Sequence, residues 1–148
     1  MNLNQDFCDF IESLNKFQVE YLIVGGYAVI FHGYNRTTGD LDIWVNATDE
    51  NYARLSEAFR FFGMSTFDMT AEKFLNTELN DVFTFGRPPV CIDILTKVKG
   101  LDFSEAFRNS KLVTISSIGL RMIDIRDLKI TKKEVNRPKD QDDLEHLP

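Results

Sequence analysis

The chain has 148 residues, of which 43% are hydrophobic and 12% aromatic, and its net charge is −6. This length and composition predict one domain, residues 1–148, with a single buried core, and exclude a disordered chain. No apolar run approaches the ~20 residues of a membrane-spanning helix, and the polar beginning does not resemble a secretion signal. The acidic balance disfavours non-specific adhesion to nucleic acid, because attraction to phosphate requires a basic surface.

The residues that most often bind zinc are too scattered to suggest a zinc site: Cys8, Cys91, His32 and His146. We expect both cysteines to be reduced core thiols in a cytoplasmic protein. The chain also lacks the Gly-x-x-x-x-Gly-Lys run of a phosphate-binding loop.

In chain order, apolar residues at helical spacing first predict an amphipathic helix around residues 7–14. Residues 21–24 then predict a short apolar strand that ends at Gly25 and Gly26, and residues 27–31 predict a brief apolar helix. A polar turn leads to the next strand. We expect the first helix to pack beside the strand at residues 21–24.

The second predicted strand covers residues 40–45, and the helix after it begins at Thr48 or Asp49 and ends at Gly63. This order of strand, helix, strand and helix predicts the α/β (α+β) class, with a mixed β-sheet flanked by helices. Residues 64–80 are ambiguous, because they fit a short strand, a turn of helix or a loop. We assign no chemistry to them.

The second half of the chain begins with a predicted hairpin, with strands at residues 82–85 and 90–95. A short helix is expected at residues 101–108, and two short strands at residues 112–115 and 119–123. The second strand of the hairpin carries an acid of interest.

The carboxyl-terminal end is basic although the whole chain is acidic. Between residues 121 and 139 the chain has seven basic residues and three acidic ones. Asp124 is expected to cap a helix that runs to about residue 135, and Pro138 suits the first position of a last helix. Three lysines share one face of the first of these helices: Lys129, Lys132 and Lys133. A polyanion should therefore prefer this end of the chain.

Two aspartates open the second predicted strand. Alternate strand residues point the same way, so Asp40 and Asp42 place two carboxylates on one face, about 6.6 Å apart along the chain. A cation or a shared proton relieves the repulsion between such carboxylates, and two hard divalent ions ~3.5–4 Å apart would fit. The alternative is a solvated strand end that carries two acids.

Asp93 is the third acid, and it stands between Ile92 and Ile94 on a strand that we expect to be buried. A carboxylate there is costly unless its charge is compensated. Its neighbours on the same face, Cys91 and Leu95, would give it a semi-apolar cleft. The alternative is a strand-end acid that accepts a hydrogen bond from a backbone N–H.

The glycine pair can serve a ligand or only a turn. Gly25 and Gly26 end a strand, where backbone N–H groups can approach a ligand closely and the next helix offers its N-terminus to phosphate. A tight turn without a ligand is the alternative. Together with the acids, the pair suggests a site for a nucleoside triphosphate and its metal ions.

The glycine pair followed by Arg36-x-Thr38-x-Asp40-x-Asp42 resembles the signature of the nucleotidyltransferase superfamily that includes DNA polymerase beta. It is most similar to the small prokaryotic branch related to the AbiEii toxins. The run from residue 137 to residue 144 resembles the Arg-x-Lys-Asp-x-x-Asp-Leu run that closes that branch.

The resemblance implies a reaction in which a nucleoside monophosphate moves from a triphosphate to an acceptor hydroxyl, with release of pyrophosphate. It implies three catalytic residues that bind two Mg2+ ions: Asp40, Asp42 and Asp93. It implies nucleotide contacts from Gly25, Gly26, Arg36, Thr38, Lys129 and Lys139, with the basic helical segment 121–148 closing the cleft. A purely structural Arg36, bonded to its own turn, is the alternative for that residue. An ordinary solvated helix face is the alternative for Lys129 and Lys139.

Two features depart from the family pattern. Many members have a serine after the first glycine, whose hydroxyl contacts the phosphates, and this chain has Gly26 there. Larger relatives hold the acceptor with an additional domain, for which this chain has little room. The acceptor would then come from a partner, a second copy or a small molecule.

The first functional hypothesis is therefore a magnesium-dependent nucleotidyltransferase that acts on RNA or protein, such as the toxin of a toxin–antitoxin pair with its antitoxin partner. A second enzymatic hypothesis is nucleotidylation of a small molecule of the aminoglycoside type. The rival from another class is a non-catalytic nucleotide-sensing or partner-binding domain. The presence of all three acids favours an enzyme.

Overall fold

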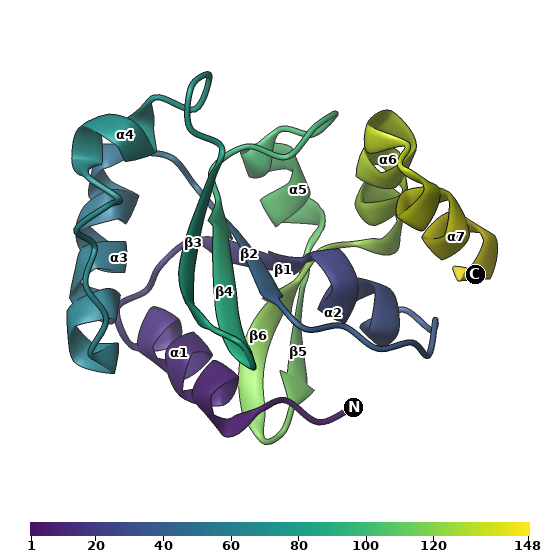
Figure 1. Cartoon of the computed structure of the whole chain (residues 1–148), viewed down its shortest axis with the longest axis horizontal. Helices are drawn as coiled ribbons and strands as arrows, with labels where there is room; N and C mark the ends of the chain where they lie inside the picture. The colour runs from purple at the N-terminus through teal and green to yellow at the C-terminus, as the bar shows by residue number, and fades with distance from the viewer.

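The computed structural model describes residues 1–148, which form one mixed β-sheet with helices packed around it (Figure 1). The sheet has six strands in the order β3-β4-β2-β1-β6-β5. The strands are β1 (Tyr21–Val24), β2 (Leu41–Val45), β3 (Val82–Arg87), β4 (Val90–Leu95), β5 (Lys111–Ile115) and β6 (Ile118–Met122). The helices are α1 (Gln5–Lys16), α2 (Gly25–Phe31), α3 (Asp49–Phe62), α4 (Ala71–Leu75), α5 (Phe103–Asn109), α6 (Ile125–Val135) and α7 (Pro138–His146).

The central strands of the sheet pair in both antiparallel and parallel orientations. β2 runs antiparallel to β1 and parallel to β4, while β1 runs parallel to β6. The two sheet edges are the hairpin strands β3 and β5, each antiparallel to its neighbour. The register places Asp42 opposite Val24 on one side and opposite Asp93 on the other. Asp42 and Asp93 are thus adjacent because of strand pairing, and not because of their spacing in the sequence.

The core lies against the central strands, where adjacent residues point to opposite faces of the sheet. On one face, α1 and α3 pack together through Phe10 and Phe59, whose ring centroids are 5.5 Å apart. On the other face, Trp44 of β2 contacts Phe103 of α5. The two central strands, β1 and β2, are therefore buried on both faces of the sheet, except where the acids lie.

The two ends of α3 are determined by the residues that the sequence predicted. The Thr48 hydroxyl accepts a hydrogen bond from the backbone N–H of Asn51 at the first turn. Gly63 ends the helix in the left-handed conformation, with φ of 95°. The mixed α+β architecture predicted from the alternation of elements is confirmed.

The structure differs from the sequence prediction mainly in two features, one helix and the position of one cysteine. The helix α4 lies within residues 64–80, which gave no usable pattern in the sequence. Cys8 is buried as predicted, but the expectation of a core position for Cys91 is wrong, because it is only half-buried. Its partner on the edge strand is Gly86, which has no side chain to cover it.

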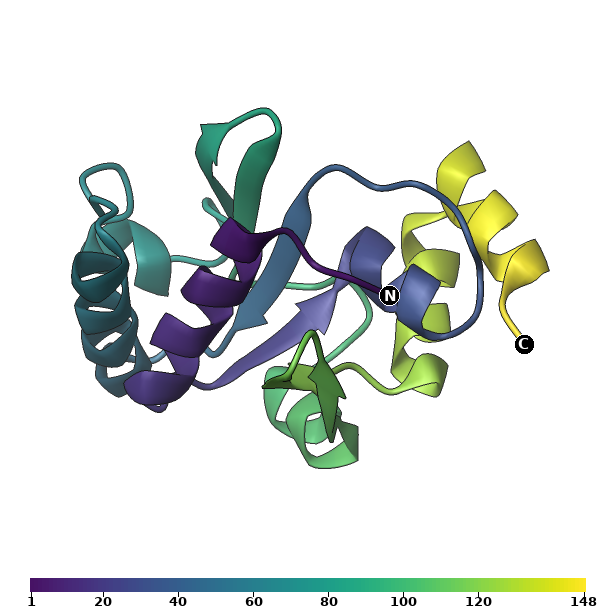
Figure 2. The same ribbon diagram turned by 90° about the horizontal axis from the view of Figure 1, so that it is seen from below.

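The last two helices, α6 and α7, lie beside the loop that joins α2 to β2 in both views (Figures 1 and 2). This loop carries the predicted residues Arg36 and Thr38. None of the helices combines the length and the apolar character that crossing a bilayer requires. The fold thus places the basic end of the chain next to the segment that precedes the acids of β2.

Candidate active site

One cleft of about 300 Å3 gathers most of the residues that the sequence singled out. No hydrophobic side chain lines it. The lining residues are Gly25, Gly26, Arg36, Thr38, Gly39, Asp40, Asp42, Asp93, Lys132, Arg137 and Lys139. The cleft therefore has an acidic wall on the sheet and a basic wall on the carboxyl-terminal segment.

The acidic wall centres on Asp42 and Asp93, which are paired across β2 and β4. Burial raises the pKa of the Asp42 carboxyl to about 7, and the nearby Asp93 carboxylate adds to the rise. The Thr84 hydroxyl of β3 donates a 2.8 Å hydrogen bond to Oδ1 of Asp93. The pair thus has excess negative charge near neutral pH, which a proton or a cation would relieve.

The donor set fits a hard divalent cation in part. Two carboxylates side by side in a polar cleft are the ligands that such cations prefer. However, no three Asp, Glu, His or Cys side chains are placed so that they could hold one metal ion together. Asp40, Asp42 and Asp93 thus line the same cleft without forming a closed set of three ligands.

The glycine turn packs directly against the acidic wall. Gly25 has φ of +67°, and a Cβ at this position would collide with the Asp42 carboxylate. A Cβ at Gly26 would collide with the hydroxyl of Thr38. Only glycine therefore allows the backbone of this turn to approach so closely.

The Thr38 hydroxyl lies beside Gly26, the position at which the resemblance led us to expect a serine. It occupies the space that a side chain at position 26 would need. A hydroxyl group thus lies beside the glycine turn, supplied by the facing loop instead of by the turn itself. The absence of a side chain at Gly26 and the position of the Thr38 hydroxyl therefore depend on each other.

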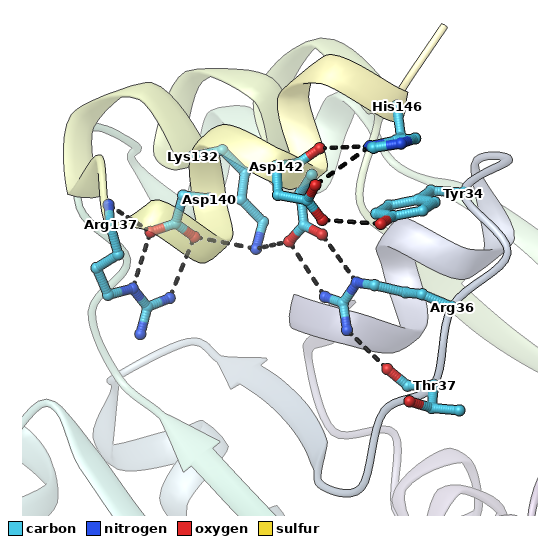
Figure 3. A network of polar contacts seen from close by, with 9 residues as sticks. Tyr34, Arg36, Thr37, Lys132, Arg137, Asp140, Asp142 and His146 are labelled. Atoms are coloured by element: carbon cyan, nitrogen blue, oxygen red, sulfur yellow. Dashed lines mark hydrogen bonds and ion pairs between the residues drawn. The ribbon is translucent and has the colours of Figure 1, made fainter.

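The basic wall is held by carboxylates of α7 (Figure 3). Nε and Nη2 of Arg36 donate hydrogen bonds of 2.8 and 3.1 Å to the two oxygens of Asp143. Nη1 of Arg36 donates to the carbonyl of Thr37. All three guanidinium nitrogens are thus engaged within the protein, so Arg36 has the structural role that the sequence left as an alternative, while it also lines the cleft.

Lys132 joins the same network from α6. Its Nζ lies 3.2 Å from Oδ1 of Asp140 and 2.9 Å from Oδ2 of Asp143, and all three side chains are buried. Burial opposes ionisation of Asp140, but hydrogen bonds from Arg137 and Lys132 lower its pKa to about 2. Both carboxylates are therefore charged at neutral pH and fix Lys132 and Arg137 at the cleft.

Comparison with known proteins supports the fold. Neither a known protein family nor a curated protein sequence matches the chain. Among solved structures, a protein from Thermotoga maritima described as a candidate nucleotidyltransferase matches with a TM-score of 0.59 at 9% sequence identity. The match covers 95% of this chain and 89% of that one. The chain has a nucleotidyltransferase-like fold.

Within this nucleotidyltransferase-like fold, the structure brings eight of the nine predicted site residues into the cleft. The exception is Lys129, which lies outside it and whose Nζ donates to the carbonyl of Pro148. Lys132, three residues later, occupies the place expected for it. The sequence holds a signal for this, because Lys132 follows the buried Leu128 by four residues and so shares its inward face.

Gly39 also lines the cleft without having been assigned a role from the sequence, and Arg137 lines it as part of the segment that the resemblance implies closes the cleft. Arg137 opens the run that resembles the family's closing motif, and its side chain and backbone both bond Asp140. The proximity of Arg137 to the cleft depends on this capping arrangement at the start of α7. The likeness at 9% identity concerns the fold alone.

The raised pKa of Asp42 predicts a pH-dependent loss of stability. Between about pH 4 and 7 the folded protein keeps a proton that the unfolded chain has released, so the free energy of unfolding falls as pH rises. Asp42→Asn removes this titration and should raise the free energy of unfolding at pH 8 by about 2–3 kcal/mol relative to wild type. The gain should shrink towards pH 4.

Urea unfolding in EDTA at a series of pH values measures this difference. Asp68→Asn is the control, because Asp68 is exposed and makes no ion pair. It should leave the pH profile unchanged. Profiles for wild type and Asp42→Asn that stay parallel from pH 4 to 8 would contradict the assignment.

The second prediction concerns Asp143, which is fully buried between two cations. Asp143→Ala leaves Arg36 and Lys132 without their shared carboxylate and should lower the free energy of unfolding by about 3–5 kcal/mol. Asp142→Ala is the matched control one residue away. Asp142 is half-exposed and accepts a hydrogen bond from the Tyr34 hydroxyl, so its loss should cost less than about 1 kcal/mol. Equal losses in urea unfolding would show that the buried network does not hold α7.

Proposed function

We propose that the protein is a magnesium-dependent nucleotidyltransferase that moves a nucleoside monophosphate from a triphosphate to an acceptor hydroxyl. The observation that carries the proposal is the polar cleft in which Asp42 and Asp93 face a basic wall across a glycine turn. The nucleotidyltransferase-like fold supports it. The acids serve the metal ions and the basic wall serves the phosphates.

Asp42 and Asp93, together with Asp40, would hold the two magnesium ions in this proposal. Bound magnesium would neutralise the charge that develops on the transferred phosphoryl group and activate the acceptor hydroxyl. Of the three residues, Asp93 is the candidate general base. The hydrogen bond from Thr84 to its Oδ1 fixes the carboxylate on the face of the sheet that lines the cleft.

The basic wall has the charge that a triphosphate requires. The network contains three cations, the buried Lys132, the largely buried Arg36 and the exposed Arg137, and only two carboxylates, so it keeps a net positive charge. Lys139 lines the cleft and pairs with no carboxylate, which leaves its ammonium free for a phosphate.

The glycine turn contributes close backbone contact. Because Gly25 and Gly26 carry no side chains, the β and γ phosphates could approach their N–H groups beside Asp42 and the Thr38 hydroxyl. This arrangement replaces the serine of many family members by a threonine from the facing loop. The phosphates would thereby be held from the turn, the loop and α6 together.

The acceptor in this proposal is RNA or protein, as for the toxin of a toxin–antitoxin pair regulated by an antitoxin, or a small hydroxyl compound. A second candidate function is nucleotide sensing without catalysis. The observation in its favour is that the three aspartates do not form a closed set of metal ligands. Transfer of label from a nucleotide separates the two functions.

The third prediction is that radiolabel moves from at least one nucleoside triphosphate, in the presence of magnesium, to RNA, cell protein or a small hydroxyl acceptor. Asp93→Asn should lower the rate by at least about a hundredfold, because it removes the candidate base and a metal ligand. Asp42→Asn should abolish transfer. Asp68→Asn, at an exposed residue outside the cleft, should transfer at the wild-type rate.

Nucleotide binding without transfer to any acceptor, in wild type and variants alike, would favour the sensor. Transfer that persists in both Asp42→Asn and Asp93→Asn would contradict the proposed site. Each reaction is compared with one in EDTA, where the wild-type rate should fall to background.

A further inference from the structure

The edge strand β3 leaves a row of backbone groups without partners. β3 pairs only with β4, and the hairpin that these two strands form projects from the rest of the molecule (Figure 2). The N–H of Thr96 donates to the carbonyl of Asp81, so every second residue counted from Asp81 is hydrogen-bonded to β4. The residues between them, Val82, Thr84 and Gly86, therefore direct their N–H and C=O groups away from the sheet.

The side chains of this edge suit a second strand. Val82 is 49% exposed although it is apolar, and Gly86, on the same face of β3, has no side chain to cover Cys91. Asp81 and Arg87 flank these residues, and both are exposed. Neither forms an ion pair within the chain. The edge thus has an exposed apolar side chain, a gap and two opposite charges without partners.

We propose that β3 pairs with β3 of a second copy of this chain, antiparallel and centred on Thr84. In this register, Val82 of each copy lies opposite Gly86 of the other, and Thr84 lies opposite Thr84. All the outward N–H and C=O groups of both strands then form hydrogen bonds. Asp81 lies opposite Arg87 of the other copy at both ends of the paired strands, and such cross-strand pairs of opposite charge stabilise a sheet.

The neighbouring registers fit less well. A shift in one direction, which centres the pairing on Phe85, places Val82 opposite Pro88, which has no N–H to donate. A shift in the other direction places Arg87 opposite Leu79, so both charge pairs are lost. A strand of another protein could satisfy the backbone groups of β3. The charges at its two ends, however, are complementary to the same strand after a two-fold rotation, which favours a second copy.

This pairing goes beyond the proposed function and places two clefts on one surface. The two six-stranded sheets become continuous, and the two-fold axis is perpendicular to them, so both clefts open on the same face. Asp93 lies on β4, one strand away from β3. The two Asp93 residues are then three strand spacings apart, ~14 Å.

Sedimentation equilibrium of the whole chain at ~1 to ~200 μM measures the association, because an interface of one strand per copy is small and should be weak. Wild type should shift from a 17.1 kDa monomer to twice this mass. Arg87→Asp places two aspartates opposite each other at both ends of the ladder and should weaken dimerisation at least about tenfold. The double variant Asp81→Arg/Arg87→Asp exchanges the charges and should restore dimerisation to within about twofold of wild type.

Cross-linking locates the axis. In a Cys91→Ser background, Thr84→Cys places two cysteines of different copies opposite each other, with their Cα atoms about 5.5 Å apart, a distance that a disulfide spans. Mild oxidation should therefore give a covalent dimer. Thr114→Cys in the same background is the matched control, because Thr114 is an exposed threonine on the other edge strand, β5. It should remain a monomer, and thermal melts confirm that each variant is folded.

Three results would overturn the inference. One is wild type that stays a monomer over the whole concentration range. Another is a dimer that Arg87→Asp leaves unchanged or that the double variant does not restore. The third is a covalent dimer from Thr114→Cys instead of Thr84→Cys. None of these results bears on nucleotidyl transfer by a single copy, so the proposed function stands or fails by its own test.

Discussion

The repulsion between Asp42 and Asp93 is the constraint on which the rest of the site depends. Strand pairing places the two carboxylates side by side, and burial makes the charge of Asp42 costly enough to raise its pKa to about 7. A fold gains nothing in stability from such a pair. Under the proposed function, the surrounding structure holds this unfavourable charge in place for a cation.

The basic wall supplies the complementary charge, and it does so from the far end of the chain. Asp143 on α7 binds Arg36 from the loop before β2 and Lys132 from α6, so one buried carboxylate joins three separate segments. The two carboxylates of the network are the means by which cations are kept beside the acids without pairing with them directly. Cations and acids thus remain on opposite walls of one cleft, with space for a polyanion between them.

Much of this arrangement could be predicted from the sequence, because the signals are local. The glycine pair, the caps of α3 and the alternation of β2 each follow from neighbouring residues. The nucleotidyltransferase-like fold expected from the resemblance is confirmed at the level of architecture. The cleft also contains the three aspartates that the strand pattern singled out.

The features that could not be predicted depend on contacts between distant segments. The spacing of Lys132 from the buried Leu128 points it inward, but only the docking of α7 places its ammonium at the cleft, while Lys129 reaches the carbonyl of Pro148. In the sequence, Gly26 stands where the resemblance leads one to expect a serine. Only the structure shows that the Thr38 hydroxyl fills the space beside it. The periodicity of a single strand or helix does not reveal which distant segment packs against it.

We propose that the paired carboxylates of β2 and β4 form a cation site. The most direct measurement is a crystal of the protein soaked in Mn2+, with anomalous scattering used to locate the ion. We predict an anomalous peak within coordination distance of both Asp42 and Asp93, with Asp40 drawn towards it. A map with no peak at this pair, or with manganese bound only elsewhere on the surface, would contradict the account.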